Sequence, residues 1–357
     1  LLMMAKMMQV GGIVGGVVLA LREIVPAIGN MPIYAVVTYG VAISVSLLVF
    51  QGYYQLIEKA SLIMIAAFTL FTFASLVALQ QTDFAISLQN MVDGLIPTIP
   101  SDQAIIFAAI GAFGITGVGG DEIMAYNYWL IEKGYAAYTG PRDESDEWER
   151  RAKGWIRVMY WDALLAMVAY TAMTTMFYLL GAAVLNRQGT VPESGELIAV
   201  LGTMYTEALG PWARSVFIAG AIVVLYSTLF AALAAWTRMF ADAFGRVGLY
   251  RFEDRKSRSL AIAVLAWVIP AIWGTLFLFM GKPALMVILG GTSTVVILLI
   301  VVFAALWFRY RRLDERMLPT KAYDAWLWLS SIAIALVAIL STRSVYDEIM
   351  KLLSGGS

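Results

Sequence analysis

Nine apolar stretches, each long enough to cross a lipid bilayer as a helix, dominate this chain of 357 residues. Crossing the hydrocarbon core takes roughly 20 consecutive apolar residues in helical form. The stretches cover about 1–21, 31–55, 60–80, 103–131, 156–185, 212–243, 260–280, 283–308 and 323–342. Because lipid offers no hydrogen-bond partner to a backbone, such spans fold as helices. The pattern therefore predicts an all-α, polytopic integral membrane protein, built as one bundle in the lipid bilayer.

The residue types present exclude several classes of function. Hydrophobic residues make up 61% of the chain and charged residues 14%, against about a quarter charged in soluble domains. Histidine and cysteine are absent, which removes the usual general base and the usual ligands of zinc and copper. The motifs HExxH, GxSxG and GxxxxGK[ST] do not occur. We therefore expect no enzyme, no catalytic residues, no cofactor and, at a net charge of zero, no nucleic-acid partner. The composition indicates no particular oligomeric state.

Lysine and arginine alternate between the connections in a way that predicts orientation. Positive charge gathers in three connections, which we expect to be cytoplasmic: 132–157, 244–259 and 309–322. Three others are poor in positive charge and should face outward: 81–102, 186–211 and 281–283. The N-terminus of this chain should then lie in the cytoplasm and its C-terminus outside. We expect a bacterial inner (plasma) membrane.

A break interrupts the apolar run from Ala104 to Leu130. Residues 111–122 place five glycines and then the adjacent Asp121 and Glu122 in this run. Each glycine costs roughly 1 kcal/mol against alanine in a helix interior, and each carboxylate near a bilayer centre costs roughly 2.5 to 3.5 kcal/mol. Packing alone would not select such a penalty, so we expect a helix broken at about 114–121, the kind of break at which transporters bind their substrates.

The predicted break supplies oxygen ligands for a cation. Carbonyl groups that end the first half-helix, such as those of Thr116 and Gly117, would lose their intrahelical donors. Asp121 and Glu122 would add negative charge beside them. Oxygen-only ligands favour hard ions, so the sequence predicts a site for Mg²⁺ or Mn²⁺/Fe²⁺.

A structural interpretation of the same residues stays open. Asp121 could be the N-cap of the second half-helix and Glu122 a residue of its first turn, both stabilised by the exposed N–H groups there. Near the start of the chain, Lys6 is expected at the cytoplasmic end of the first helix, where a long side chain reaches water. Gly11 with Gly15, and Gly12 with Gly16, should allow close helix contact.

Several polar groups in other apolar stretches are candidates for an ion pathway or for a second layer around the site. The candidates are Asn127, Asp162, Tyr226, Ser227 and Thr228. Asp162 could equally pair with Arg157 or be solvated. Hydroxyl groups in mid-helix, including those of residues 292–294, more often bond back to their own helix. The acidic run at 143–147 is expected to be a solvated loop.

Motifs in several segments are similar to those of one transporter family. The segments are Gln51 to Lys59, Gly94-Leu95-Ile96-Pro97-Thr98-Ile99-Pro100, Ile156 to Val184 with Asp162, Leu209-Gly210-Pro211, and Tyr226-Ser227-Thr228-Leu229. They resemble, in order, the turn between the fourth and fifth helices, the lead-in to the sixth helix, the seventh helix and, for the last two segments, the eighth helix of NRAMP divalent-metal transporters. On this alignment the chain runs from the family's third helix to its eleventh.

The resemblance implies a fold and a boundary for each part. The family has a LeuT-like fold of two inverted five-helix repeats whose broken helices meet at the midplane. Residues 1–80 would hold the last three helices of the first repeat, 103–308 the second repeat, and 323–342 an additional helix. The opening Leu1-Leu2-Met3-Met4 lies within an apolar run, so we expect an N-terminally truncated chain.

Two departures from the family pattern affect the expected chemistry. The family's first helix, which supplies an Asp and an Asn to the metal, has no counterpart here, and the Met-Pro-His motif is replaced by residues 116–122. This indicates a divergent branch with a harder site and no proton coupling through histidine. The alternative is a transporter of amino acids or other organic solutes on the same fold. The carboxylates at the break disfavour it, because they would repel a substrate carboxylate.

Overall fold

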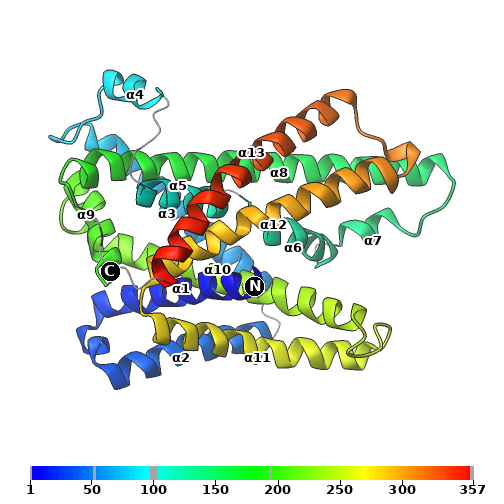
Figure 1. Ribbon diagram of the computed structural model, residues 1–357, viewed down its shortest axis with the longest axis horizontal. Helices are drawn as coiled ribbons and strands as arrows, with labels where there is room; N and C mark the ends of the chain where they lie inside the picture. Colours follow the sequence, from blue (N-terminus) through cyan, green and yellow to red (C-terminus); the bar gives the residue numbers. More distant parts are fainter. Residues whose placement is uncertain are drawn as a thin grey trace. The chain divides into compact units, whose positions relative to one another are not determined.

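The computed structural model describes residues 2–50, 54–96, 103–116, 118–132, 134–190, 192 and 195–353 (Figure 1). In these ranges the chain is helical, without β-strands. The longer helices are α1 (Leu2–Ile24), α2 (Met31–Phe50), α3 (Tyr54–Leu79), α5 (Gln103–Ile115), α6 (Gly120–Glu132), α8 (Asp146–Gly181), α9 (Leu197–Leu209), α10 (Ala213–Arg246), α11 (Arg255–Met280), α12 (Pro283–Arg311) and α13 (Lys321–Leu353). The short elements are η1 (Pro26–Gly29), α4 (Leu88–Gly94), α7 (Tyr135–Thr139), a π-helical turn η2 (Ala182–Asn186) and η3 (Glu315–Met317).

Nine segments of the described chain are long and apolar enough to cross a membrane, in agreement with the nine predicted stretches. The polytopic, all-α class is confirmed. Tryptophans near helix ends, such as Trp212, Trp307 and Trp326, are exposed, as expected of side chains at a membrane interface.

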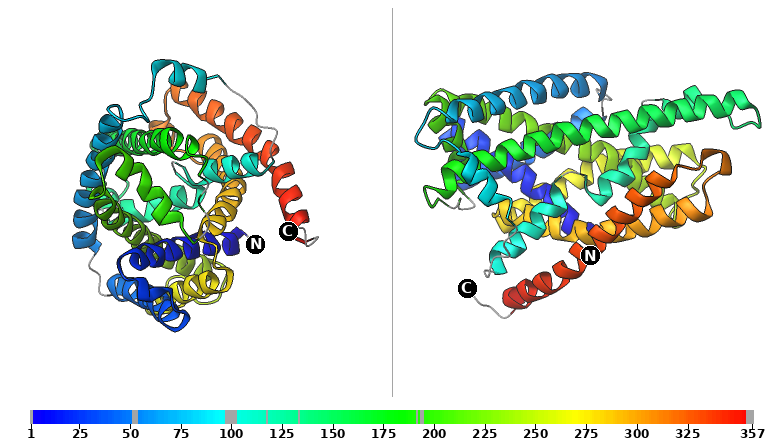
Figure 2. Two further views of the ribbon diagram at one scale, coloured as in Figure 1. Left: turned by 90° about the vertical axis from the view of Figure 1, so that its left-hand side faces the viewer. Right: turned by 90° about the horizontal axis from the view of Figure 1, so that it is seen from above.

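Helix α8 begins ten residues before the expected start at 156, because local signals extend it into the acidic run. The Ser145 hydroxyl accepts a hydrogen bond from the backbone N–H of Trp148 at 3.2 Å, which caps the helix. Three acidic residues occupy the first turn, where the helix dipole favours them. Ion pairs four residues apart follow, Glu147 with Arg151 and Glu149 with Lys153. The result is one continuous helix of 36 residues (Figures 1 and 2).

Helix α9 lies in the connection 186–211, which the sequence predicted only as a loop. The side chain of Tyr205 on α9 is fully buried and stacks on Phe71 and Phe217. Its hydroxyl group shares a hydrogen bond of 3.1 Å with the hydroxyl group of Thr72. The apolar spacing in 197–209 was visible in the sequence, but the segment is too short to span a bilayer. A run of this length in a connection does not by itself distinguish a helix from a loop.

The chain divides into two compact units, each assembled from separate stretches. Unit 1 holds Leu1–Lys6, Pro100–Tyr170 and Ile288–Ser357, and unit 2 holds Met7–Ile99 and Thr171–Val287. In unit 2, α10 packs against α2, α3, α9 and α11. In unit 1, α5 packs against α13, and Ile110, Val295 and Ala338 form a small buried cluster.

The four glycines of α1 allow close packing within unit 2, as predicted. A Cβ added at Gly12 would lie 2.7 Å from the Pro283 carbonyl oxygen, and one at Gly15 would lie 2.3 Å from the Phe277 ring. Ordinary carbon contacts are at least about 3.5 Å. Only glycine leaves room for these neighbours, and α1 stays helical through all four positions.

Candidate functional site

The helix break lies between α5 and α6, where the sequence predicted it. Helix α5 ends at Ile115 and α6 begins at Gly120. The backbone N–H of Thr116 still donates to the Ala112 carbonyl at 2.8 Å, and the Gly119 carbonyl accepts the first bond of α6 from Ile123 at 3.0 Å. Thr116 is exposed. Gly117, the other predicted carbonyl ligand, lies outside the described residues.

Glu122 caps the second half-helix. Its carboxylate accepts a hydrogen bond from the backbone N–H of Gly119 at 2.8 Å. A third-position glutamate that reaches back to the residue before the helix is one half of a capping box. The alternative that made Asp121 the N-cap is therefore wrong, because Gly119 takes that position and Glu122 supplies the capping oxygen. The residue as a whole is exposed, whereas the hydrogen bond of its carboxylate to Gly119 is partly buried.

Asp121 is buried, with 8% of its surface exposed, and faces a lysine. Its Oδ1 lies 2.8 Å from the Nζ of Lys6, in the first turns of α1. Lys6 is itself only 7% exposed. The expectation that Lys6 reaches water at the helix end is wrong, since the residue is buried and its ammonium group turns inward to Asp121.

Three of the glycines around the break serve packing against α12. A Cβ at Gly114 would lie 1.9 Å from the carbonyl oxygen of Gly291, and one at Gly291 would lie 2.3 Å from that of Gly111. A Cβ at Gly120 would meet Ile297 at 2.6 Å. The two backbones are therefore in direct contact across α5 and α12. The inference that packing would not select these glycines is wrong for Gly111, Gly114 and Gly120.

Two further candidates belong to unit 1, Asp162 on α8 and Asn127 on α6 itself. Asp162 on α8 accepts a hydrogen bond from the Tyr126 hydroxyl at 3.0 Å. This bond to Tyr126 on α6 is a contact of Asp162 that the sequence did not predict. Asn127 is exposed.

The mid-helix hydroxyls mostly bond to their own helices, as expected. Ser227 and Thr228 both donate to the Val224 carbonyl, and Thr292, Ser293 and Thr294 donate to carbonyls of α12. Tyr226 differs, because its hydroxyl donates to Ser44 on α2 at 2.8 Å and so ties two helices of unit 2 together.

Comparison with known families decides the identity of this arrangement. The family model described as "Natural resistance-associated macrophage protein-like" (Nramp) matches residues 1–347. The chain belongs to the Nramp family. A search of curated proteins finds no match to it. Membership implies transport of divalent metal ions, which are substrates here, and members of the Nramp family are transporters and not enzymes.

Transport of a metal ion requires ligands, and clusters of charged or sulfur-bearing side chains are one source of them. No group of three or more His, Cys, Asp or Glu side chains in the described chain could hold a metal ion. The acidic run at 143–147 also contains no such group.

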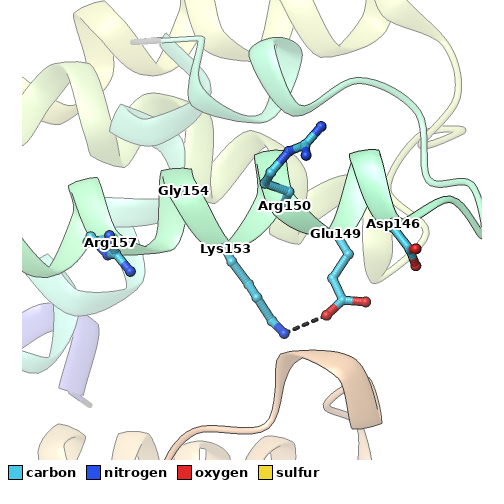
Figure 3. Close-up of a pocket in the computed structure, with 6 residues that line it drawn as sticks. All are labelled: Asp146, Glu149, Arg150, Lys153, Gly154 and Arg157. Atoms are coloured by element: carbon cyan, nitrogen blue, oxygen red, sulfur yellow. Dashed lines mark hydrogen bonds and ion pairs between the residues drawn. The ribbon is translucent and has the colours of Figure 1, made fainter.

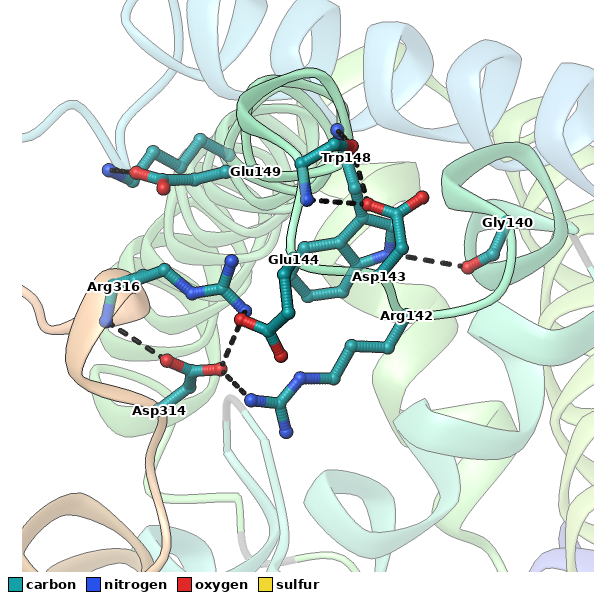
Figure 4. Close-up of polar contacts among 10 residues, drawn as sticks. Gly140, Arg142, Asp143, Glu144, Trp148, Glu149, Asp314 and Arg316 are labelled. Atoms are coloured by element: carbon teal, nitrogen blue, oxygen red, sulfur yellow. Dashed lines mark hydrogen bonds and ion pairs between the residues drawn. The ribbon is translucent and has the colours of Figure 1, made fainter.

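That acidic run instead contributes to a polar cluster with the connection between α12 and α13 (Figure 4). Asp314 lies 2.8 Å from Arg142 and 3.5 Å from Arg316, and Arg316 lies 3.6 Å from Glu144. A hydrogen bond from the backbone N–H of Arg316 holds the pKa of Asp314 below its ordinary value. The pKa of Asp143 is lowered likewise, by hydrogen bonds from Ser145. These contacts join two connections that were predicted to share one side of the membrane.

An open pocket of about 460 Å³ lies along the start of α8 (Figure 3). Its lining residues carry both signs of charge: Asp146, Glu149, Arg150, Lys153, Gly154 and Arg157. The ion pair of 2.5 Å between Lys153 and Glu149 crosses it. The pocket shares no lining residue with the helix break, and its chemistry does not resemble that of a divalent-cation site, because positive side chains predominate.

Proposed function

We propose that this Nramp protein carries hard divalent cations, Mg²⁺ or Mn²⁺/Fe²⁺, through a site at the α5–α6 break. Asp121 and Glu122 would provide carboxylate ligands, and the backbone carbonyl groups of Thr116 and Gly117 would be the remaining protein ligands. Tyr226, Ser227, Thr228, Asn127 and Asp162 stay candidates for the pathway or for groups behind the ligands.

The observation that carries the proposal is the environment of Asp121. A buried carboxylate in a membrane segment is costly unless it faces a positive charge. Asp121 faces the Lys6 ammonium at 2.8 Å, so the position already accommodates a cation. The start of a helix and a buried carboxylate thus lie at one place, and the negative charge of the carboxylate supports a positively charged ligand.

The ligand set favours ions that keep part of their water. Mg²⁺ is commonly bound by one or two carboxylates and retains several water molecules. Two carboxylates without a third His, Cys, Asp or Glu among the described residues suit that pattern. Since the chain contains no histidine and no cysteine, softer transition metals find no imidazole or thiolate here.

Orientation and internal symmetry form part of the proposal. We place the basic connections 132–157, 244–259 and 309–322 in the cytoplasm of a bacterial cell. The contact of Arg142 with Asp314 supports a common side for two of them, since it joins both connections at one end of unit 1. We also propose that 1–80 and 103–308 belong to two inverted repeats, with 323–342 as an additional helix.

The test is ion flux into proteoliposomes for the parent and for Asp121→Asn, which keeps the side-chain shape and removes the charge. We expect flux of Mg²⁺ or Mn²⁺ in the parent and a loss of at least about 100-fold in the variant, in line with removal of a charged ligand. Asp242→Asn is the matched control, because Asp242 also pairs with a cation, Arg258, but in unit 2. The relative rates of the two ions identify the preferred substrate.

Two results would contradict the proposal. Equal flux in Asp121→Asn and in the parent would place the metal elsewhere. A well-folded parent that moves neither ion, but moves an amino acid or another organic solute, would favour the alternative substrate class.

A further inference from the structure

Lys6 is an ionisable residue buried in a membrane protein, with its charge directed at the proposed metal ligand. The side chains of Lys6 and Asp121 are 9% and 11% exposed, and their charged atoms lie 2.8 Å apart. The Asp121 oxygen Oδ1 makes no aligned hydrogen bond in the described chain. The contact therefore acts mainly through charge, as a cation placed against an anion.

Burial makes this pair difficult to explain as a stabilising device. Removing two charges from water costs about as much as their attraction returns, and apolar residues of similar size would serve a packed core as well or better. An ionisable side chain within a membrane segment is by default a functional group. Lys6 has a flexible stem of four carbons, so its ammonium group can move away without any change of backbone.

We propose that the Lys6 ammonium is a tethered competitor that a substrate ion must displace from Asp121. This rests on the proposed function, since it assigns a role to the neighbour of the proposed ligand. The competition sets the affinity of the site and its selectivity for charge. A monovalent ion that replaces the ammonium exchanges one positive charge for another, whereas a divalent ion adds a second charge to the attraction.

The same arrangement favours release. Without the ammonium, a carboxylate buried beside the helix break would bind a divalent ion so tightly that it leaves slowly. With Lys6 in place, departure of the ion is coupled to return of the ammonium. Lys6 therefore lowers affinity, and a residue with a purely structural role would not have this effect.

The experiment measures apparent Kd from the rise in the thermal unfolding midpoint of the purified protein with Mn²⁺ or Mg²⁺, in detergent. The parent is compared with Lys6→Met, which keeps the length of the side chain and removes its charge. We expect the variant to bind the divalent ion more tightly, by about 5- to 150-fold, the usual range of coupling between linked sites. Potassium or sodium ions should compete with Mn²⁺ in Lys6→Met and not in the parent. Lys6→Arg, which keeps the charge, should behave like the parent.

Controls separate this inference from the proposed function. Lys153→Met removes the same charge from the exposed start of α8, and its Kd should equal that of the parent. If neither the parent nor Lys6→Met responds to divalent ions, the proposed function fails. If both respond with equal Kd and Asp121→Asn does not respond, the metal site stands and the role of Lys6 is overturned. Should Lys6→Met not fold, Lys6→Gln gives the same comparison, because its amide can still donate to Asp121 without charge.

Discussion

Two segments of the chain are rich in glycine, one in α1 and one around the α5–α6 break, but only the second interrupts its helix. Helix α1 carries Gly11, Gly12, Gly15 and Gly16 and remains continuous from Leu2 to Ile24. The other segment, 111–120, has a similar density of glycine and ends one helix and starts another. In both, glycines lie where a neighbouring helix comes close. Glycine content therefore reports close packing and does not by itself break a helix.

What distinguishes the second segment is a signal to start a new helix. Glu122 returns a hydrogen bond to the N–H of Gly119, so the interrupted backbone is satisfied at the new N-terminus. Glu122 lies three positions after Gly119, whereas no glycine of α1 has a carboxylate three positions after it. A break inside a membrane thus requires groups that stabilise the exposed N–H groups, as well as residues that weaken the helix.

The largest change in the free energy of unfolding is expected when the buried ion pair between Lys6 of α1 and Asp121 at the break is disrupted. Asp121→Asn removes the carboxylate charge that lies 2.8 Å from the buried Lys6 ammonium, and loss of one partner of a buried pair costs about 3 to 5 kcal/mol. Equilibrium unfolding in mixed micelles measures the change. The double variant Lys6→Met/Asp121→Asn should recover most of the loss. A change under about 1 kcal/mol in Asp121→Asn would mean that the pair is not buried in the protein in solution.

The next effect concerns the backbone contact between α5 and α12. Gly114→Ala places a methyl group against the Gly291 carbonyl oxygen, which cannot turn away as a side chain can. We expect a loss of about 3 kcal/mol, the upper part of the range for overpacking. Gly154→Ala on α8 is the matched control, because nothing lies within 4 Å of the added atom. It should raise stability by up to about 1 kcal/mol, and equal effects in the two variants would disprove the close contact.

A smaller loss of stability is expected when a glycine of α1, Gly15, is replaced by alanine. Gly15→Ala meets the ring of Phe277, a side chain that can shift, so the loss should be about 1 to 2 kcal/mol. Gly40→Ala in α2 has free space around it and provides the control in unit 2. If Gly15→Ala proves more harmful than Gly114→Ala, the difference between side-chain and backbone obstruction is not what separates the two segments.

The sequence predicted the parts of this fold that depend on length and pattern. The nine spans follow from the length of the apolar runs, and the break predicted at about 114–121 follows from the placement of glycines and carboxylates. It failed where contacts between distant segments decide. Lys6 and Asp121 are more than 100 positions apart, and nothing local tells that α1 begins beside α6. The capping role of Glu122 depends on which residue starts the helix. If α6 began two residues later, Asp121 would be its N-cap.

The smallest effect separates the two roles that remain open for Glu122. Glu122→Ala removes the acceptor of the Gly119 N–H and should cost about 1 kcal/mol, as the loss of a capping group does. Glu122→Gln keeps a side-chain oxygen that can accept the same bond, so its free energy of unfolding should stay near that of the parent. Its affinity for Mn²⁺ is the informative quantity, measured from the same unfolding curves. A weaker affinity with unchanged stability would make Glu122 both cap and ligand, whereas unchanged affinity would leave Asp121 as the carboxylate that binds the ion and confine Glu122 to holding the break open.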